Sequence, residues 1–170
     1  NTSSFSFVFG FVLKNSETLK YLISSKSNLW NIYNHEGDIF LSINDNSSLR
    51  PDRVKLSINK IICYKLYEIK ITVTQKKIIV NFNNQITSTD AFLKLNPCST
   101  NTNCADGECV LNKCHLTSDE YYFGKFNTQY FDMFIGGVKI STSSNNQEET
   151  ECNFRGTDFK NKRLCMESCK

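Results

Sequence analysis

The sequence is poor in proline, glycine and alanine. Its 170 residues include only 2 Pro and 7 Gly, so Asn, Asp and Ser must form most of the turns. Alanine, the strongest helix former, is nearly absent, which argues against a helical bundle. The chain has instead 13 Phe and 7 Tyr. With its many Ile and Val residues, these favour strands and supply enough apolar surface for a core.

Two further absences limit the classes of function. No apolar run reaches the length of a membrane helix, since the longest, Phe7–Leu13, is interrupted by Gly10. The net charge is only +3, and the lysines are scattered rather than gathered in a stripe, so we expect no nucleic-acid partner. The chain also lacks an initiator Met and a signal peptide, and we expect it to be a segment of a larger protein.

Alternating apolar and polar residues predict strands along most of the chain. The clearest case is Leu66–Asn84, where the alternation runs through Tyr67–Thr74 and again through Lys77–Phe82 about a polar turn. A β-hairpin with one buried face produces this pattern. The other expected strands are Phe5–Leu13, Leu19–Ser24, Leu29–Tyr33, Asp38–Ile43, Val54–Ile62, Tyr121–Phe126 and Phe131–Ile140. Their spacing predicts an all-β antiparallel sandwich or barrel.

Eight cysteines indicate an oxidising compartment, so we expect a secreted or extracellular cell-surface protein. Glycosylation sequons begin at Asn1 and Asn46 and support a glycoprotein. Zinc binding is the alternative use of the cysteines, but their spacing lacks the tight C-x2-C pair of structural zinc sites. The residues weighed as zinc ligands are Cys104, Cys109, Cys114 and His115.

We therefore expect all eight cysteines to form disulfides, which are Cys63, Cys98, Cys104, Cys109, Cys114, Cys152, Cys165 and Cys169. The four central cysteines allow three pairings, one of which is Cys98–Cys109 with Cys104–Cys114. The partner of Cys63 is expected among the late cysteines, with Cys152 as one choice.

The strand segments FSFVFGFVL, LKYLIS, GDIFLSI, the hairpin and FDMFIGGVKI resemble, in this order, the laminin G-like and concanavalin A-like jelly-roll family. This resemblance implies a β-sandwich over residues 1–143 with a cysteine-rich insertion at 96–116. The insertion resembles part of an epidermal-growth-factor-like module through CADGECVLNKC. A linker and a cysteine-containing C-terminal segment are expected at 144–170. Gly136–Gly137 is expected to form a bulge in the last strand, and other β-sandwiches remain the alternative.

Aromatic residues provide the candidate binding sites. Neighbouring residues of a strand point to opposite faces, so one ring of each adjacent pair should face solvent. On this basis Tyr122 and Tyr130 are candidate binding residues. Trp30 is interpreted as a core residue, with an exposed platform for a sugar or a protein as the alternative, and Tyr33 beside it. The family resemblance also implies calcium at the sandwich rim, for which Asp45 and Asp132 are the candidates, and no other cofactor is expected.

The carboxylates do not indicate catalysis. Glu36 and Asp38 have the spacing that begins a glycosidase motif, but no further acid follows, so they are interpreted as turn and strand-entry residues. We therefore expect no enzyme activity. The expected function is protein binding or cell adhesion within a larger ectodomain attached to a membrane through the rest of the protein. The Asn-, Lys- and Ile-rich composition resembles protist surface proteins and suggests host-cell attachment or invasion. The alternative function is that of a carbohydrate-binding lectin, with a glycan in place of a protein receptor.

Overall fold

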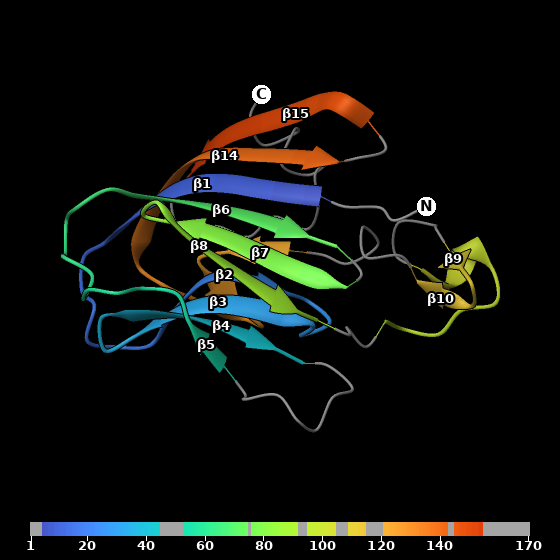
Figure 1. Ribbon diagram of the computed structural model, residues 1–170, viewed down its shortest axis with the longest axis horizontal. Helices are drawn as coiled ribbons and strands as arrows, with labels where there is room; N and C mark the ends of the chain where they lie inside the picture. Colours follow the sequence, from blue (N-terminus) through green and yellow to red (C-terminus); the bar gives the residue numbers. More distant parts are fainter. Residues whose placement is uncertain are drawn as a thin grey trace.

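The chain forms two antiparallel sheets that pack face to face as a jelly-roll-like β-sandwich (Figure 1). The computed structural model describes residues 5–44, 53–74, 76–91, 95–104, 109–114, 121–142 and 145–154, the last of these by backbone alone. The prediction of an all-β antiparallel fold with a disulfide-bonded insertion is confirmed.

The sandwich has one six-stranded and one five-stranded sheet. The six-stranded sheet has the order β15-β14-β1-β6-β7-β8, and the five-stranded sheet has the order β11-β2-β3-β4-β5. The chain changes sheet after β1, after β5 and after β8, and returns after a small β12–β13 hairpin. The bounds are β1 Phe5–Leu13, β2 Lys20–Ser25, β3 Trp30–His35, β4 Asp38–Ile43, β5 Arg53–Lys55, β6 Tyr67–Val73, β7 Lys77–Phe82, β8 Gln85–Asp90, β9 Cys109–Val110, β10 Lys113–Cys114, β11 Tyr121–Phe123, β12 Lys125–Phe126, β13 Gln129–Tyr130, β14 Met133–Thr142 and β15 Asn145–Phe154.

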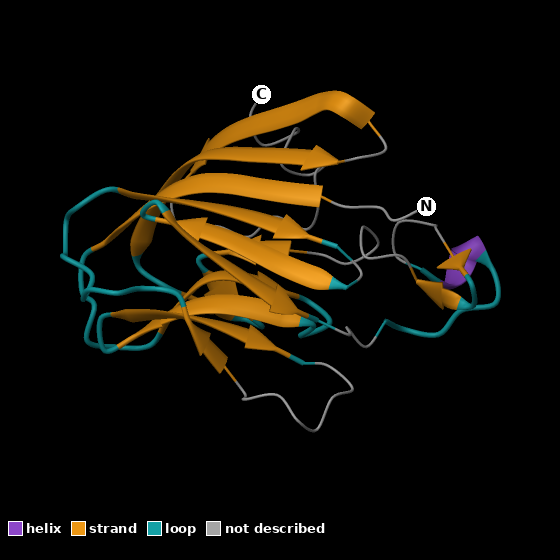
Figure 2. Cartoon of the chain, viewed as in Figure 1, coloured by secondary structure: helices purple, strands orange, loops and turns teal. Residues whose placement is uncertain are grey.

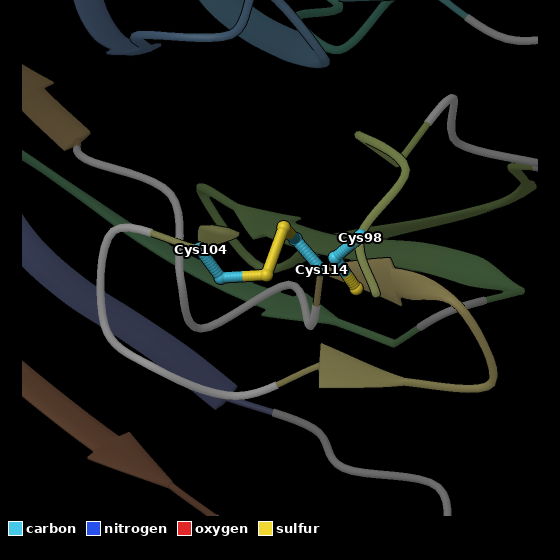
Figure 3. A group of neighbouring side chains, drawn as sticks. All are labelled: Cys98, Cys104 and Cys114. Atoms are coloured by element: carbon cyan, nitrogen blue, oxygen red, sulfur yellow. A yellow bond between two sulfur atoms is a disulfide. The ribbon is translucent and has the colours of Figure 1, made fainter. Parts of the chain in front are cut away.

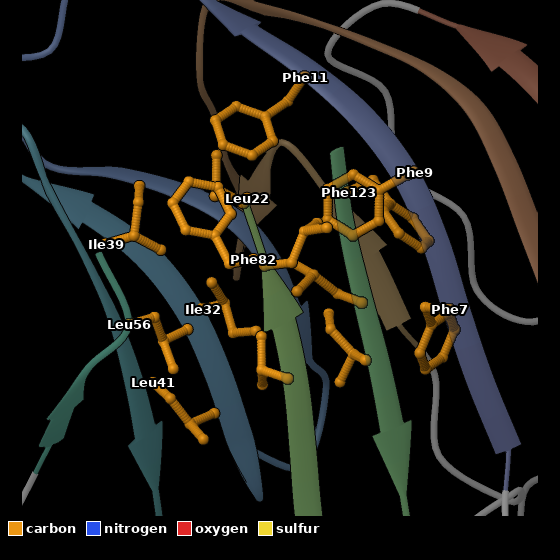
Figure 4. Packing of buried hydrophobic residues seen from close by; sticks show 14 of the residues in the cluster. Phe7, Phe9, Phe11, Leu22, Ile32, Ile39, Leu41, Leu56, Phe82 and Phe123 are labelled. Atoms are coloured by element: carbon orange, nitrogen blue, oxygen red, sulfur yellow. The ribbon is translucent and has the colours of Figure 1, made fainter. Parts of the chain in front are cut away.

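Aromatic residues dominate the core between the sheets (Figure 4). The inward residues of β1 include Phe7 and Phe9, which are almost completely buried. The Phe9 ring meets the Phe123 ring edge to face, with 5.2 Å between centroids, and the Phe7 ring lies 5.0 Å from that of Tyr121. These contacts join the centre of one sheet to the edge strand of the other. Aromatic pairs of this geometry add stability beyond the area that they bury.

The predicted hairpin is present, and its alternating apolar residues are buried as expected. Residues Tyr67, Ile69, Ile71 and Val73 of β6 are buried, and β6 pairs with β7 in register from Ile69–Phe82 to Val73–Ile78. Its outer residues are polar. The hairpin therefore supplies two non-edge strands of the six-stranded sheet.

The predicted bulge at Gly136–Gly137 is confirmed. The register between β1 and β14 shifts between Val8–Lys139 and Gly10–Gly136. Gly137 has φ +62°, a left-handed conformation that glycine adopts without steric cost. The bulge lets Ile135 and Val138 both face the core, where they are buried.

Two disulfides hold the insertion together. Cys98 is bonded to Cys109 and Cys104 to Cys114, one of the three pairings that the sequence leaves open. The insertion contains β9, β10 and a 3-10 turn at Asn101–Asn103, the helical segment of the described chain (Figure 2). In Figure 1 it lies at the right of the view, beside the end of the sandwich. Because each disulfide closes a short loop, the pair fixes a segment too small to form a core of its own.

Three strand predictions need correction. The expected strand Tyr121–Phe126 is divided at Gly124 into β11 and β12, which lie in different sheets. The expected strand Val54–Ile62 is only β5, Arg53–Lys55, because the following residues leave the sheet as an irregular connection. The expected linker begins instead with β15, which pairs with β14 at the edge of the six-stranded sheet. The polar composition of this segment shows no apolar alternation in the sequence. It can still form a strand, because backbone hydrogen bonds need no apolar side chains.

Within the described part of the chain, no helix is long and apolar enough to span a bilayer.

Replacing Phe9 by Ala should destabilise the domain by about 3–5 kcal/mol, because the change leaves a cavity where the two sheets meet. Urea unfolding followed by the fluorescence of the buried Trp30 measures this loss. The matched control is Val12→Ala on the outer side of the same strand, which should cost about 1 kcal/mol or less. Equal losses for the two variants would contradict the assignment of the core face.

Candidate functional site

A continuous row of aromatic rings crosses the outer face of the five-stranded sheet. Tyr21 stacks on Phe126 with 4.2 Å between ring centroids and lies 5.3 Å from Tyr33. Tyr33 lies 5.7 Å from Phe40. All four side chains are partly exposed. We call Phe126, Tyr21, Tyr33 and Phe40 the outer aromatic row.

Strand register brings the row together. Tyr21 pairs directly with Tyr33, and Tyr33 pairs with Phe40, so the three rings share one face of β2, β3 and β4. Directly paired residues have neighbouring side chains in an antiparallel sheet. A register shift between Tyr21 and Ile23 turns Ile23 into the core and leaves Tyr21 outside.

Cations border the row at β5. The Arg53 guanidinium lies 4.2 Å from the centroid of the Phe40 ring, within the range of a cation–π contact. Lys55, two residues on, pairs with Phe40 in register. These side chains are exposed, so their charges are available to a ligand on the row.

Asp38 is the acidic residue beside these cations. Its Oδ2 atom accepts a hydrogen bond from Lys60 Nζ at 2.7 Å, and Oδ1 lies 3.5 Å from Lys55 Nζ. The hydrogen bond from Lys60 is the main cause that holds the pKa of Asp38 below its usual value, with a smaller contribution from Lys55. One carboxylate thus faces two lysines, and Arg53 on the same strand as Lys55 leaves the β5 end of the face cationic.

Tyr21 is a partly buried phenol of the row. Burial raises its pKa above the ordinary tyrosine value, and the nearby Tyr33 adds to the rise. The Phe131 ring, 5.8 Å from Tyr21, covers it from the segment after β13. Like any tyrosine phenol, that of Tyr21 is neutral near pH 7 and can donate a hydrogen bond there.

Two of the predicted binding residues meet in a second cluster. The Lys125 ammonium lies 4.8 Å from the ring centroids of both Tyr122 and Tyr130. Tyr130 is exposed, whereas Tyr122 is largely buried. The strand β12 carries both Lys125 and Phe126, so this cluster adjoins one end of the outer aromatic row.

Trp30 cannot bind a ligand. Its side chain is fully buried and packs on Phe7 and Tyr121, which agrees with the core interpretation and removes it from the candidate binding residues. Tyr33, three residues later, faces the opposite side of β3. Alternation along the strand thus separates the two rings that the sequence places close together.

The structure describes one of the two candidate calcium ligands. Asp45 lies outside the described residues. Asp132 is exposed and forms an ion pair with Lys14, with 3.2 Å between Oδ1 and Nζ. Glu36 and Asp38 are turn and strand-entry residues as predicted: Glu36 has φ +52° before Gly37, and Asp38 begins β4.

Within the described residues, three cysteine sulfurs form the one group that resembles a metal site. The sulfurs of Cys98, Cys104 and Cys114 lie within 4.8 Å of one another, and Figure 3 shows them side by side. All three are in disulfides, so the cluster is two adjacent bridges, as the sequence favours.

Cys63 departs from the prediction. It is a free thiol, and its sulfur donates to Ser16 Oγ at 3.6 Å. The expected disulfide at this residue is therefore not formed within the described part of the chain. The side chains of its expected partners, Cys152, Cys165 and Cys169, lie outside the described residues.

Sequence reasoning missed Tyr21, Phe40, Phe126 and Arg53. A signal for Phe40 was present, because Ile39 and Leu41 on either side are apolar and Phe40 must face the other way. Tyr21 gave no such signal, since its face depends on the register shift in β2. Phe126 and Arg53 are far from the other rings in the sequence, and only the fold brings them close.

The comparisons with known proteins give likenesses of structure only. No protein-family model matches the chain, and no curated protein sequence matches it. Among solved structures, it is similar to alginate lyase A1-II′, a member of polysaccharide lyase family-7, with 17% identity over 84% of this chain and 62% of that chain and a TM-score of 0.43. A product complex of a variant of this lyase gives 16% identity, 84% and 63% coverage and a TM-score of 0.47.

The alginate lyase from Corynebacterium sp. is also similar, with 11% identity, 84% and 59% coverage and a TM-score of 0.42. The chain therefore spans less than two thirds of the length of these lyases. These similar structures are named as alginate lyases, and with this finding the predictions of a protein-binding adhesion module and of a chain without enzyme activity are corrected.

The geometry at Asp38 predicts a pH-dependent contribution to stability. Because its pKa is lower in the folded than in the unfolded chain, Asp38 stabilises the fold above the usual pKa of about 3.9. This contribution is lost as the pH falls through the lowered folded value. Asp38→Asn should therefore cost about 1 kcal/mol at neutral pH, and the difference should vanish in acid.

Urea unfolding of wild type and variant over a pH series measures this difference. The control is Asp132→Asn, which removes a more exposed pair with Lys14 and should have a smaller effect. A difference between wild type and Asp38→Asn that persists unchanged in acid would show that the carboxylate charge is not its source.

Proposed function

We propose that this domain binds an acidic polysaccharide across the outer face of its five-stranded sheet. The observation that carries the proposal is the outer aromatic row with Arg53 at its end. Partly exposed rings are suited to stack on the apolar faces of sugar rings, as they do on other flat apolar groups. Ring centroids 4.2–5.7 Å apart offer successive contacts to an extended chain rather than a pocket for one sugar.

The charges favour an acidic glycan. The exposed Arg53 guanidinium lies over the Phe40 ring, and a guanidinium is suited to carboxylate or sulfate recognition. Lys55 and Lys60 both contact Asp38. Because Arg53 adds a third cation to these two lysines and their one carboxylate, a ligand that brings negative charge improves the balance.

At the other end of the row, Lys125 lies between Tyr122 and Tyr130. A polysaccharide that follows the row from Phe40 to Phe126 would end beside this ammonium. Exposed Tyr130 offers one more ring there. The two cationic ends with aromatic rings between them support binding of an elongated anionic chain.

Tyr33→Ala and Phe40→Ala should each weaken binding of alginate, a polyuronate, by about tenfold. Affinity electrophoresis or calorimetry with alginate oligosaccharides measures the loss. The matched control is Phe134→Ala, which removes a partly exposed ring with a nearby lysine, Lys14, from the outer face of the other sheet. This control should bind as wild type.

Arg53→Ala should reduce the preference for alginate over a neutral β-glucan, because the charge and not the stacking surface is lost. Failure of the wild-type domain to bind either polymer, or equal losses for Phe40→Ala and Phe134→Ala, would refute the proposal. Ultraviolet absorbance of unsaturated products during the same incubation reports whether bound alginate is also cleaved.

The proposal also includes the cellular location, the family resemblances and calcium binding. We propose a secreted or cell-surface location, supported by the disulfides Cys98–Cys109 and Cys104–Cys114, which persist in oxidising compartments. The resemblances to laminin G-like domains and to an epidermal-growth-factor-like insertion are supported by the order of the strand motifs and by CADGECVLNKC alone. Calcium at the sandwich rim is likewise a proposal, which rests on the same resemblance.

A further inference from the structure

The connection between β5 and β6 exposes a group of large apolar side chains. The exposed fractions are 73% for Ile58, 59% for Ile62, 72% for Tyr64 and 70% for Leu66. In Figure 1 this connection, residues 56–66, lies at the left edge of the view, beyond the ends of the strands and opposite the disulfide-bonded insertion. Large exposed apolar side chains that gather in one connection make it a candidate docking surface.

Buried residues of the same connection hold these side chains outward. Leu56 and Ile61 are buried, and their N–H groups donate to Ile39 O and Gly37 O at 2.7 Å each. The Ile62 N–H donates to the Tyr67 hydroxyl at 2.9 Å. The connection is thus anchored on both sheets, and its exposed apolar residues cannot turn into the core, which its buried ones already fill.

Tyr64 is held outward by its backbone. Its φ is +62°, a left-handed conformation that is unfavourable for a bulky residue, and its N–H donates to Leu13 O at 2.8 Å. The result is a ring that is directed to solvent. A tyrosine presents an apolar body and a polar tip, which suits the boundary between water and lipid.

The charges of the segment have one sign. Residues 53–67 contain Arg53, Lys55, Lys60 and Lys65 and no Asp or Glu. Lys55 and Lys60 share Asp38 of the neighbouring strand, and Lys65 lies 5.3 Å from the centroid of the Tyr67 ring. Lysines that surround exposed apolar residues place their charges at the level of lipid headgroups while the stems stay in apolar contact.

We infer that residues 56–66 are a membrane-docking loop that inserts its apolar side chains into the headgroup region of an anionic bilayer. A protruding apolar tip with a cationic border fits the surface of such a bilayer, where apolar burial and attraction to anionic lipid act together. The apolar side chains of this contact lie outside the outer aromatic row, but Lys55 and Lys60 adjoin both surfaces. Arg53, which borders the row, lies on β5, the strand that leads directly into the loop.

Sedimentation with vesicles of phosphatidylcholine, with and without phosphatidylserine, tests this inference. The wild-type domain should bind the phosphatidylserine vesicles, and added salt should weaken binding because the lysine contribution is screened. The double variant Ile58→Asp/Ile62→Asp should bind about tenfold more weakly. Lys65→Glu should reduce binding to anionic vesicles more than to neutral ones.

The matched control is Leu111→Asp, which places the same charge at a side chain that is 92% exposed on the disulfide-bonded insertion. This variant should bind vesicles as wild type. A second readout is the emission of Tyr64→Trp, which should shift to shorter wavelength on addition of vesicles.

Three outcomes would overturn the inference. One is a wild-type protein that binds neither kind of vesicle. Another is a loss of vesicle binding for Leu111→Asp equal to that for Ile58→Asp/Ile62→Asp. The third is a wild-type dimer in analytical ultracentrifugation that Ile58→Asp/Ile62→Asp dissociates, which would assign the surface to contact between copies of the chain. Alginate binding by the loop variant, which leaves the outer aromatic row intact, distinguishes failure here from failure of the proposed function.

Discussion

Burial of the inward side of β1 between the two sheets is the interaction on which the sandwich depends. β1 pairs with both β14 and β6, so it lies inside the six-stranded sheet, and its Phe7 and Phe9 rings reach Tyr121 and Phe123 of the other sheet. Each fully buried ring contributes on the order of 2–3 kcal/mol through apolar burial alone. Since one face of each sheet is used in this way, every remaining function must be carried by the outer faces, the rims and the connections.

The outer faces of the two sheets differ in their side chains. The outer side of β6 is polar, as in an ordinary solvated sheet, whereas β2, β3 and β4 carry rings across theirs. Arg53 on Phe40 and Lys125 between two tyrosines keep cations at both ends. The connection of residues 56–66 starts from the same strand as Arg53, so a domain that rests on a membrane through this loop would hold the β5 end of its aromatic row close to the lipid surface.

Local patterns predicted much of the fold. The bounds of β1, β4 and β7 follow the expected ranges, because in these strands a period of two residues coincides with one buried face. The pattern misled where burial alternates without a sheet: Ile61 is buried and Ile62 exposed, yet both lie in a connection. It gave no strand for β15, whose first seven residues are all polar and which is held by backbone pairing with β14. In the site, Tyr33 lies on the outer face, whereas the alternative of an exposed Trp30 fails, although the two lie on one strand.

The sequence by itself determined the sandwich class, the alternation of the hairpin, the bulge at Gly136–Gly137 and the presence of a disulfide-bonded insertion, because each depends on residues close together in the chain. Tertiary structure alone decided which rings meet outside the core. Phe126, Tyr21 and Phe40 come from three separate parts of the chain, and Tyr21 faces outward only because the register of β2 and β3 shifts beside it. A shift of one residue moves a side chain to the opposite face of a sheet, and no local pattern encodes the order in which distant strands pair.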